Sequence, residues 1–97
     1  MANFEFTEEA EEDLIAIIHY TQQRWGSVQA HTYIDGLEIL CEKLAENPGL
    51  GLLRDELKTG VLSFSYREHL SFYLPGPNGI SIVRVLHQSM DTKKQFE

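Results

Sequence analysis

Two neighbouring segments of the chain carry apolar residues at helical spacing, and only two residues join them. Thr7 is suited to cap the first helix, Gly26 ends it, and Ser27 can cap the second, which ends at Asn47-Pro48-Gly49. The positions of the two stripes are three or four residues apart: Ala10, Leu14, Ile17, Ile18, Thr21 and Trp25, then Ala30, Tyr33, Ile34, Leu37, Leu40, Cys41 and Leu44. Helices joined by so short a link run antiparallel, so the sequence predicts a helical hairpin.

Strand patterns flank this hairpin. Phe4 and Phe6 alternate with polar residues and predict a short N-terminal strand with both rings on one face. Three segments after the hairpin also have strand patterns: residues 61–66, 69–74 and 80–86. The run Pro75–Gly79 supplies a tight turn between the last two. Residues 50–60 show no clean period, and the polar tail at 92–97 is expected to fray.

The order of these elements predicts an α+β fold. An N-terminal strand, an antiparallel helical hairpin and a three-strand antiparallel meander are expected to form one sheet with the hairpin on one face. The 97 residues suffice for a single domain spanning 1–97. The N-terminus has no signal-peptide pattern, no apolar run is long enough to span a membrane, and Cys41 is the one cysteine. These features favour a cytoplasmic protein without disulfides.

The charge of the chain is divided unevenly between its halves. Residues 1–50 hold ten acidic and two basic side chains, which sum to −8, whereas residues 51–97 hold five acidic and six basic, which sum to +1. The total of −7 disfavours a protein that clamps nucleic acid non-specifically through phosphate contacts. A basic segment of a partner suits the N-terminal half better.

Most residues with chemical potential are expected to be structural. Core packing is the favoured role for Trp25, Tyr33, Phe72 and Tyr73, and also for Cys41. His19 and His31 lie off the apolar stripes and are expected on the surface, and the acidic residues before Leu14, Asp13 among them, fall on the polar face of the first helix. The histidines lack metal-site spacing and no phosphate-binding glycine loop occurs, so neither a metal nor a cofactor is predicted.

One arginine interrupts the otherwise apolar strand at 80–86. A guanidinium there must reach a carboxylate, a carbonyl or solvent, because burying it alone is prohibitive. Arg84 either lies on a solvated face of a half-buried strand or forms a functional surface with His87, Met90 and Asp91. The spacing alone favours the first interpretation.

A second set of polar residues falls with Arg84 in the adjacent strands of the C-terminal half. Arg67, Glu68 and His69 are residue types that could serve RNA cleavage together with Arg84 and His87, as base, acid and phosphate-stabilising cations. Strand alternation places Arg67 and His69 on one face and Glu68 on the other. Whether Arg84 or His87 joins that face depends on a register that the sequence leaves open.

Several motifs in a fixed order carry a family resemblance. They are Ala10-x-x-Asp13-Leu14-x-x-Ile17-x-x-Tyr20, Trp25-Gly26-x-x-x-Ala30-x-x-Tyr33, Leu44-Ala45-x-Asn47-Pro48-x-x-Gly51, His69-Leu-Ser-Phe72-Tyr73 and Ile82-Val-Arg84-Val-Leu-His87-x-x-Met90-Asp91. From Phe4 to Asp91, the chain resembles the ParE branch of the RelE/ParE toxin superfamily of bacterial toxin–antitoxin systems. The resemblance implies the same α+β fold.

The resemblance also implies a function and its partners. ParE-type toxins act on DNA gyrase by protein–protein binding rather than as enzymes, and a ParD-like antitoxin neutralises them. The target-binding residues would be Arg67, His69, Arg84, His87, Met90 and Asp91. Two alternatives remain: a ribosome-dependent endoribonuclease of the RelE type that uses His69 or His87 with Arg67 and Arg84, or a non-toxic antitoxin-binding remnant. The acidic composition favours the ParE branch, although this chain has Val61-Leu62-Ser63 where several relatives carry arginine.

Overall fold

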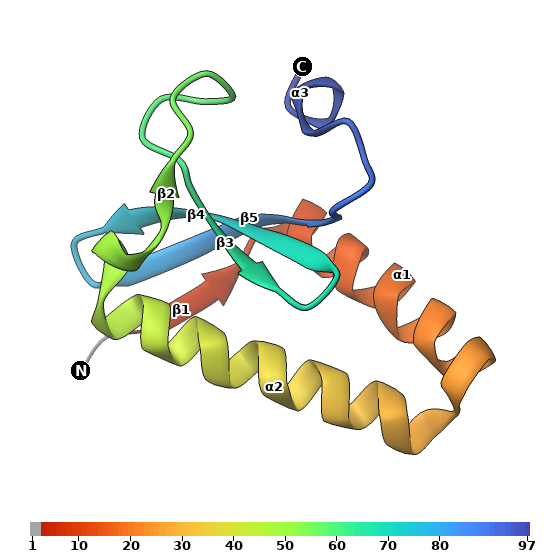
Figure 1. The fold of residues 1–97 in the computed structure, drawn as a ribbon. Coiled ribbons are helices and arrows are strands. Elements are labelled where there is room, and N and C mark those ends of the chain that lie inside the picture. The colour runs from red at the N-terminus through yellow and green to blue at the C-terminus, as the bar shows by residue number, and fades with distance from the viewer. Residues whose placement is uncertain (1–2) are drawn as a thin grey trace.

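The computed structural model describes residues 3–97 and contains one five-stranded sheet with two long helices on one face (Figure 1). The elements in chain order are β1 (Asn3–Phe6), α1 (Glu8–Trp25), α2 (Ser27–Glu46), the 3-10 helix η1 (Pro48–Leu50), β2 (Leu52–Leu53), β3 (Leu62–Tyr66), β4 (His69–Gly76), β5 (Gly79–His87) and α3 (Thr92–Gln95). The strand order is β1-β5-β4-β3-β2, with β1 parallel to β5 and the other neighbours antiparallel. The predicted α+β class is confirmed.

The helical hairpin forms as the sequence predicts, with one change at the link. The Thr7 hydroxyl accepts the Ala10 backbone N–H at 3.2 Å and caps α1. Gly26 alone joins the helices, with a φ of 90° that favours glycine. The predicted Ser27 cap is wrong, because Gly26 occupies the cap position and Ser27 is already the first residue of α2. Within residues 3–97, neither helix is apolar over a stretch long enough to cross a membrane.

The main core lies between the hairpin and the sheet. The buried residues of α1, α2, β4 and β5 in this cluster are Ala10, Ile17, Leu37, Cys41, Leu44, Ala45, Tyr73, Ile80, Ile82 and Val85. Cys41 is fully buried, and burial raises the pKa of its thiol to about 12. The prediction that Trp25 packs in the core is wrong, since its side chain is 69% exposed. Trp25 ends α1 at the hairpin tip, which projects beyond the sheet in Figure 1, so no strand covers it.

A smaller core lies on the opposite face of the sheet. Val61, Phe72 and Leu86 are buried there, and Phe96 packs on Phe72 with ring centroids 5.1 Å apart. The expected fraying of the tail is therefore wrong. The polar pattern of 92–97 concealed one aromatic ring, Phe96, which attaches the end of the chain to Phe72 of the sheet. Figure 1 shows α3 on the side of the sheet away from the two long helices.

The connector between the hairpin and the meander contains a strand that the sequence did not reveal. Leu52 and Leu53 pair with Ser63 and Leu62, so the sheet has five strands rather than the four predicted. Tyr73 holds this connector in place: its hydroxyl donates to the Pro48 carbonyl at 2.7 Å and accepts the Gly51 N–H at 2.9 Å. A strand of two residues is too short to show a period of two, which explains the omission.

Candidate functional site

Two adjacent hollows open between α1 and the sheet. The first, of about 480 Å³, is lined by Asp13, Ala16, Ile17, Tyr20, His69, Val85, His87, Ser89 and Met90. The second, of about 280 Å³, extends toward the hairpin tip and is lined by Tyr20, Thr21, Trp25, Gln29, Tyr33, Arg67, Glu68 and His69. Tyr20 and His69 line both. The two hollows therefore form one continuous candidate surface along α1.

A histidine pair forms part of the wall of the first hollow. His69 of β4 and His87 of β5 are direct cross-strand partners, and their rings meet edge to face with centroids 5.3 Å apart. Ser89 donates its backbone N–H to His87 Nδ1 at 3.1 Å, which leaves the His87 proton on Nε2. That Nε2 lies 3.8 Å from Glu68 Oε2.

A hydrogen bond to a tyrosine of α2 fixes the His69 side chain. Its Nδ1 lies 2.5 Å from the Tyr33 hydroxyl. Burial, together with the nearby charge of His87, lowers the pKa of His69, whereas burial raises the pKa of Tyr33 to about 12. Both shifts keep the proton on the tyrosine, so Tyr33 donates and His69 Nδ1 accepts. The imidazole of His69 is thereby fixed as the tautomer protonated on Nε2.

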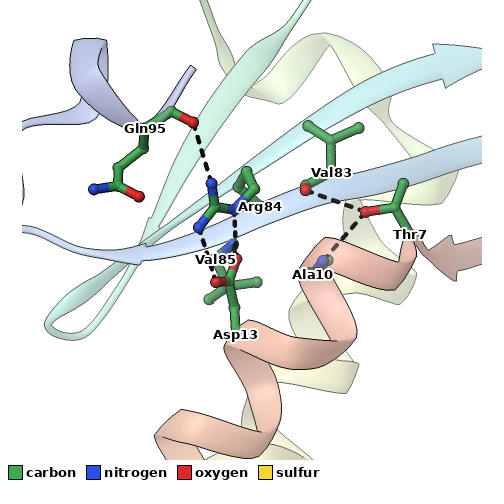
Figure 2. Close-up of polar contacts among 7 residues, drawn as sticks. All are labelled: Thr7, Ala10, Asp13, Val83, Arg84, Val85 and Gln95. Carbon is green, nitrogen blue, oxygen red and sulfur yellow. Dashed lines mark hydrogen bonds and ion pairs between the residues drawn. The ribbon is translucent and has the colours of Figure 1, made fainter. Parts of the chain in front are cut away.

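Arg84 lies at the edge of the sheet and is bound to Asp13 (Figure 2). Its Nε and Nη2 donate to the two Asp13 oxygens at 2.8 and 3.0 Å, and Nη1 donates to the Gln95 carbonyl at 3.2 Å. The hydrogen bonds from Arg84 to Asp13 raise the pKa of the guanidinium. The two side chains are only 18% and 15% exposed. The favoured prediction of a solvated Arg84 is therefore wrong, as is that of Asp13 on the polar face of its helix.

The position of Asp13 follows from where β1 ends. β1 pairs with β5 only as far as Ile82, so the next backbone groups of β5 have no strand beside them. Side chains of the α1 N-terminal region replace that strand: the Thr7 hydroxyl donates to the Val83 carbonyl at 3.1 Å, and Asp13 accepts the Val85 N–H at 2.9 Å (Figure 2). Asp13 thus satisfies an edge N–H and a guanidinium at once.

The turn between β3 and β4 changes the predicted arrangement of Arg67 and Glu68. Both residues lie in the turn rather than in a strand, and Arg67 has a φ of 53°. The alternation argument does not apply to a turn, and Glu68 lines the same hollow as Arg67 and His69. The expected separation of Glu68 from the other two is wrong.

The last two predicted residues have different surroundings. Met90 is 47% exposed and lines the first hollow. Asp91 caps α3, where its side chain accepts the Lys94 N–H at 3.4 Å. The structure therefore brings His69, His87 and Met90 together in one hollow and Arg67 with His69 in the next. It places Arg84 in an ion pair and Asp91 at a helix cap.

The charged groups at this surface limit the reactions that it could catalyse. Two imidazoles could transfer protons, but the Arg84 guanidinium lines neither hollow and is neutralised by Asp13, and Glu68 brings a carboxylate near His87. Among residues 3–97, no three His, Cys, Asp or Glu side chains are grouped so as to hold a metal ion. With its exposed aromatic and thioether side chains, the surface is better suited to binding a protein than to stabilising a phosphorane.

Comparison of the sequence with known protein families identifies the family of this chain. A family model described as "ParE toxin of type II toxin-antitoxin system, parDE" matches residues 4–92. The chain belongs to the ParE toxin family.

Curated ParE relatives match the chain over most of their length. "Toxin ParE1" of Caulobacter vibrioides is 37% identical over 93 residues, which cover 96% of each chain. "Toxin ParE" of Escherichia coli is 35% identical over 92 residues, covering 94% of this chain and 89% of that protein. The ParE resemblance noted in the sequence is confirmed.

Solved structures agree with the ParE fold. A chain from "Chromosomal ParDE TA system from P. aeruginosa" matches with a TM-score of 0.75 at 19% identity, covering 90% of this chain and 96% of that one. A chain from "YoeB-YefM complex from Staphylococcus aureus" matches with a TM-score of 0.59 at 23% identity, covering 91% and 98%. At these identities the likeness shows the fold alone.

Three residues of the candidate surface escaped sequence reasoning about function. Asp13, Tyr20 and Tyr33 line the hollows or hold the residues that do. The signal was present in the motifs of the ParE resemblance, which contain all three at fixed spacing. Only the approach of α1 and α2 to β4 and β5 shows what these positions contact.

Proposed function

We propose that this ParE-family chain inhibits DNA gyrase by protein–protein binding and that a ParD-like antitoxin neutralises it. Family membership supports the toxin role, and the P. aeruginosa relative of the same fold was solved as a ParDE system. The proposal keeps the cytoplasmic location and the absence of a cofactor predicted from the sequence.

The single observation that carries the binding mechanism is the occupied state of Arg84. Nε and Nη2 of its guanidinium donate to Asp13, and Nη1 donates to the Gln95 carbonyl. A ribonuclease of the predicted kind would use both Arg67 and Arg84 to meet the phosphate, and Arg84 is already occupied by Asp13. Glu68 stands near the histidine pair instead, and its carboxylate would repel a phosphodiester. This supports non-enzymatic inhibition.

We place the target contact on the rim of the two hollows. Met90 and His87 reach the first hollow, and Arg67 and His69 reach the second. Arg84 and Asp91 then contribute indirectly. Arg84 fixes β5 through its ion pair with Asp13, and Asp91 fixes α3 by accepting the Lys94 N–H. Binding by this surface needs no turnover.

The test is a supercoiling and cleavage-complex assay with purified gyrase. Wild type should block supercoiling or accumulate cleaved DNA, and Met90→Ala and His87→Ala should weaken the effect. These variants are preferable to Arg84→Ala, which would also disturb the fold. Gln88→Ala, an exposed neighbour in sequence, is the control. A gyrase reaction unaffected by the wild-type protein would exclude this target.

The ribonuclease alternative keeps a separate test. Primer extension on mRNA after induction would reveal ribosome-dependent cuts if His69 or His87 acted with Arg67 and Arg84. Intact mRNA would eliminate that activity. Growth arrest upon expression without antitoxin would eliminate the third alternative, a non-toxic remnant.

We assign the antitoxin to the first hollow, between α1 and the sheet. The hollow offers apolar side chains such as Ile17 and Met90, and the first turns of α1 carry Glu8, Glu9, Glu11 and Glu12. A basic segment with apolar anchors fits this combination. Ala16→Arg, which fills the hollow from an exposed position, should abolish neutralisation by a co-expressed antitoxin. Neutralisation that persists in this variant would place the antitoxin elsewhere.

A further inference from the structure

The tip of the helical hairpin differs in charge from the rest of the chain. Residues 14–34 contain no Asp or Glu, although the chain has 15 of them, and they include Arg24. This stretch forms the last three turns of α1, the Gly26 link and the beginning of α2. Acidic side chains lie before it and resume at Asp35. The hairpin tip is therefore a non-acidic end on a protein of net charge −7.

Large apolar side chains are exposed at this same tip. Trp25 is 69% exposed, Val28 82% and Tyr20 55%. The guanidinium of Arg24 lies 5.2 Å from the centroid of the Tyr20 ring. Trp, Tyr and Arg are the residue types that carry most of the binding energy at protein interfaces. Their exposure together has no explanation in the packing of residues 3–97.

A second arginine reaches the tip from the sheet. Arg67 and Trp25 both line the hollow of about 280 Å³. Glu68 lines it too, but its carboxylate lies 3.8 Å from Nε2 of His87, which belongs to the first hollow. Arg67 has a φ of 53°, a left-handed conformation that costs a non-glycine residue about 1 kcal/mol. Within the described chain, no hydrogen bond or ion pair of its side chain offsets this cost; its guanidinium lies 5.7 Å from the Tyr66 ring centroid. An arginine where the turn favours glycine indicates a role outside the fold.

We propose that the hairpin tip, defined by Arg24, Trp25, Val28 and Arg67, docks an acidic segment of the protein that this toxin targets. Trp25 and the hollow beside it accept an apolar side chain, while the two arginines pair with carboxylates. Charge complementarity distinguishes this surface from the antitoxin site, because the acidic first turns of α1 suit a basic segment. The inference rests on the proposed function in one respect, namely that the target is a protein.

Substitutions at the tip can separate binding from folding. Arg67→Gly removes the cation and relieves the left-handed backbone, so it should raise the melting temperature or leave it unchanged while weakening inhibition. Trp25→Ala removes the exposed anchor, and Ile39→Ala on α2, 54% exposed, is its matched control. Arg24→Glu and its control Lys43→Glu each change the net charge by the same amount. Growth arrest in cells and gyrase inhibition by purified protein are the two readouts.

The tip variants should differ clearly from their controls. We expect Trp25→Ala and Arg67→Gly to require at least about tenfold more protein for half-maximal inhibition, as hot-spot residues do. Ile39→Ala and Lys43→Glu should stay within about twofold of wild type, the range of near-neutral surface changes. Added salt should weaken wild type more than Arg24→Glu, because it screens the charge pairing.

Each outcome decides the proposal. Tip variants that arrest growth and inhibit gyrase as the controls do would overturn it, and so would variants that stay toxic but escape a co-expressed antitoxin. If wild type arrests growth without affecting gyrase, the proposed target fails and the growth readout alone decides the role of the tip. If wild type arrests nothing, both proposals fail.

Discussion

The ion pair of Asp13 and Arg84 predicts a large effect from one substitution. We expect Asp13→Ala to lower the free energy of unfolding by about 3–4 kcal/mol, a large part of the ~5–15 kcal/mol of a typical domain. About 2 kcal/mol would come from a guanidinium only 18% exposed that loses its counter-ion. About 1–2 kcal/mol more would come from the Val85 N–H, which loses its acceptor.

The reverse substitution should cost less. In Arg84→Ala, Asp13 keeps the Val85 N–H, so we expect a loss of about 2–3 kcal/mol. The double variant should lose no more than Asp13→Ala alone, about 3–4 kcal/mol, which gives a coupling energy of about 2–3 kcal/mol. The exposed neighbour Glu12→Ala serves as a control and should change stability by less than about 0.5 kcal/mol.

Urea unfolding followed by far-ultraviolet circular dichroism is the suitable assay. Trp25 fluorescence would be a poor probe, because this side chain is already 69% exposed in the folded protein. A loss below about 1 kcal/mol in Asp13→Ala, or a coupling energy near zero, would refute the reasoning, since exposed ion pairs typically contribute that little.

Three further predictions concern the core and the histidine pair. Gly36→Ala places a Cβ against the Tyr66 hydroxyl, which donates to the Tyr33 carbonyl. The clash should cost about 2–3 kcal/mol, more than the ~1 kcal/mol that alanine gains over glycine inside α2, so urea unfolding should show a net loss of about 1–2 kcal/mol and a gain in stability would contradict the packing. Ser71→Ala removes a buried hydroxyl that lacks a hydrogen-bond partner among the described residues, so the same assay should show stability unchanged or raised by about 1 kcal/mol, and a clear loss would point to an undetected partner. Burial lowers the pKa of His69, so the folded state binds this proton less readily than the unfolded state; stability should be complete above about pH 6.5 and fall as the pH drops toward the lowered pKa. Melting temperatures at pH 7 and pH 5 should show this loss in wild type and less of it in His69→Gln, and equal losses in both proteins would assign it to other groups.

The helices and the meander could be predicted because their signals are local. The stripe from Ala30 to Leu44 repeats over about four turns, and the turn before Ile80 is marked by two prolines and two glycines. Such patterns depend only on neighbours within a few residues. They suffice for the fold class and for most of the core, including Cys41, Phe72 and Tyr73.

The candidate surface could be predicted only in part. His69 and His87 were recognised as residues of interest, but the β4–β5 register that makes them direct partners was open. Arg67 was assigned to a strand and lies in a turn, which changes what shares its hollow. A register is a relation between strands, and a sequence pattern describes each strand separately.

The sequence by itself determined that the chain forms a helical hairpin against a meander, since 3.6-residue and two-residue periods are properties of contiguous residues. Only the tertiary structure decided that Arg84 meets Asp13, 71 positions earlier. Where β1 stops short of β5, an unsatisfied edge N–H and a guanidinium need the same carboxylate, and α1 alone brings one there. The tertiary structure likewise left Trp25 in solvent, because the apolar stripe of α1 is longer than the sheet that covers it.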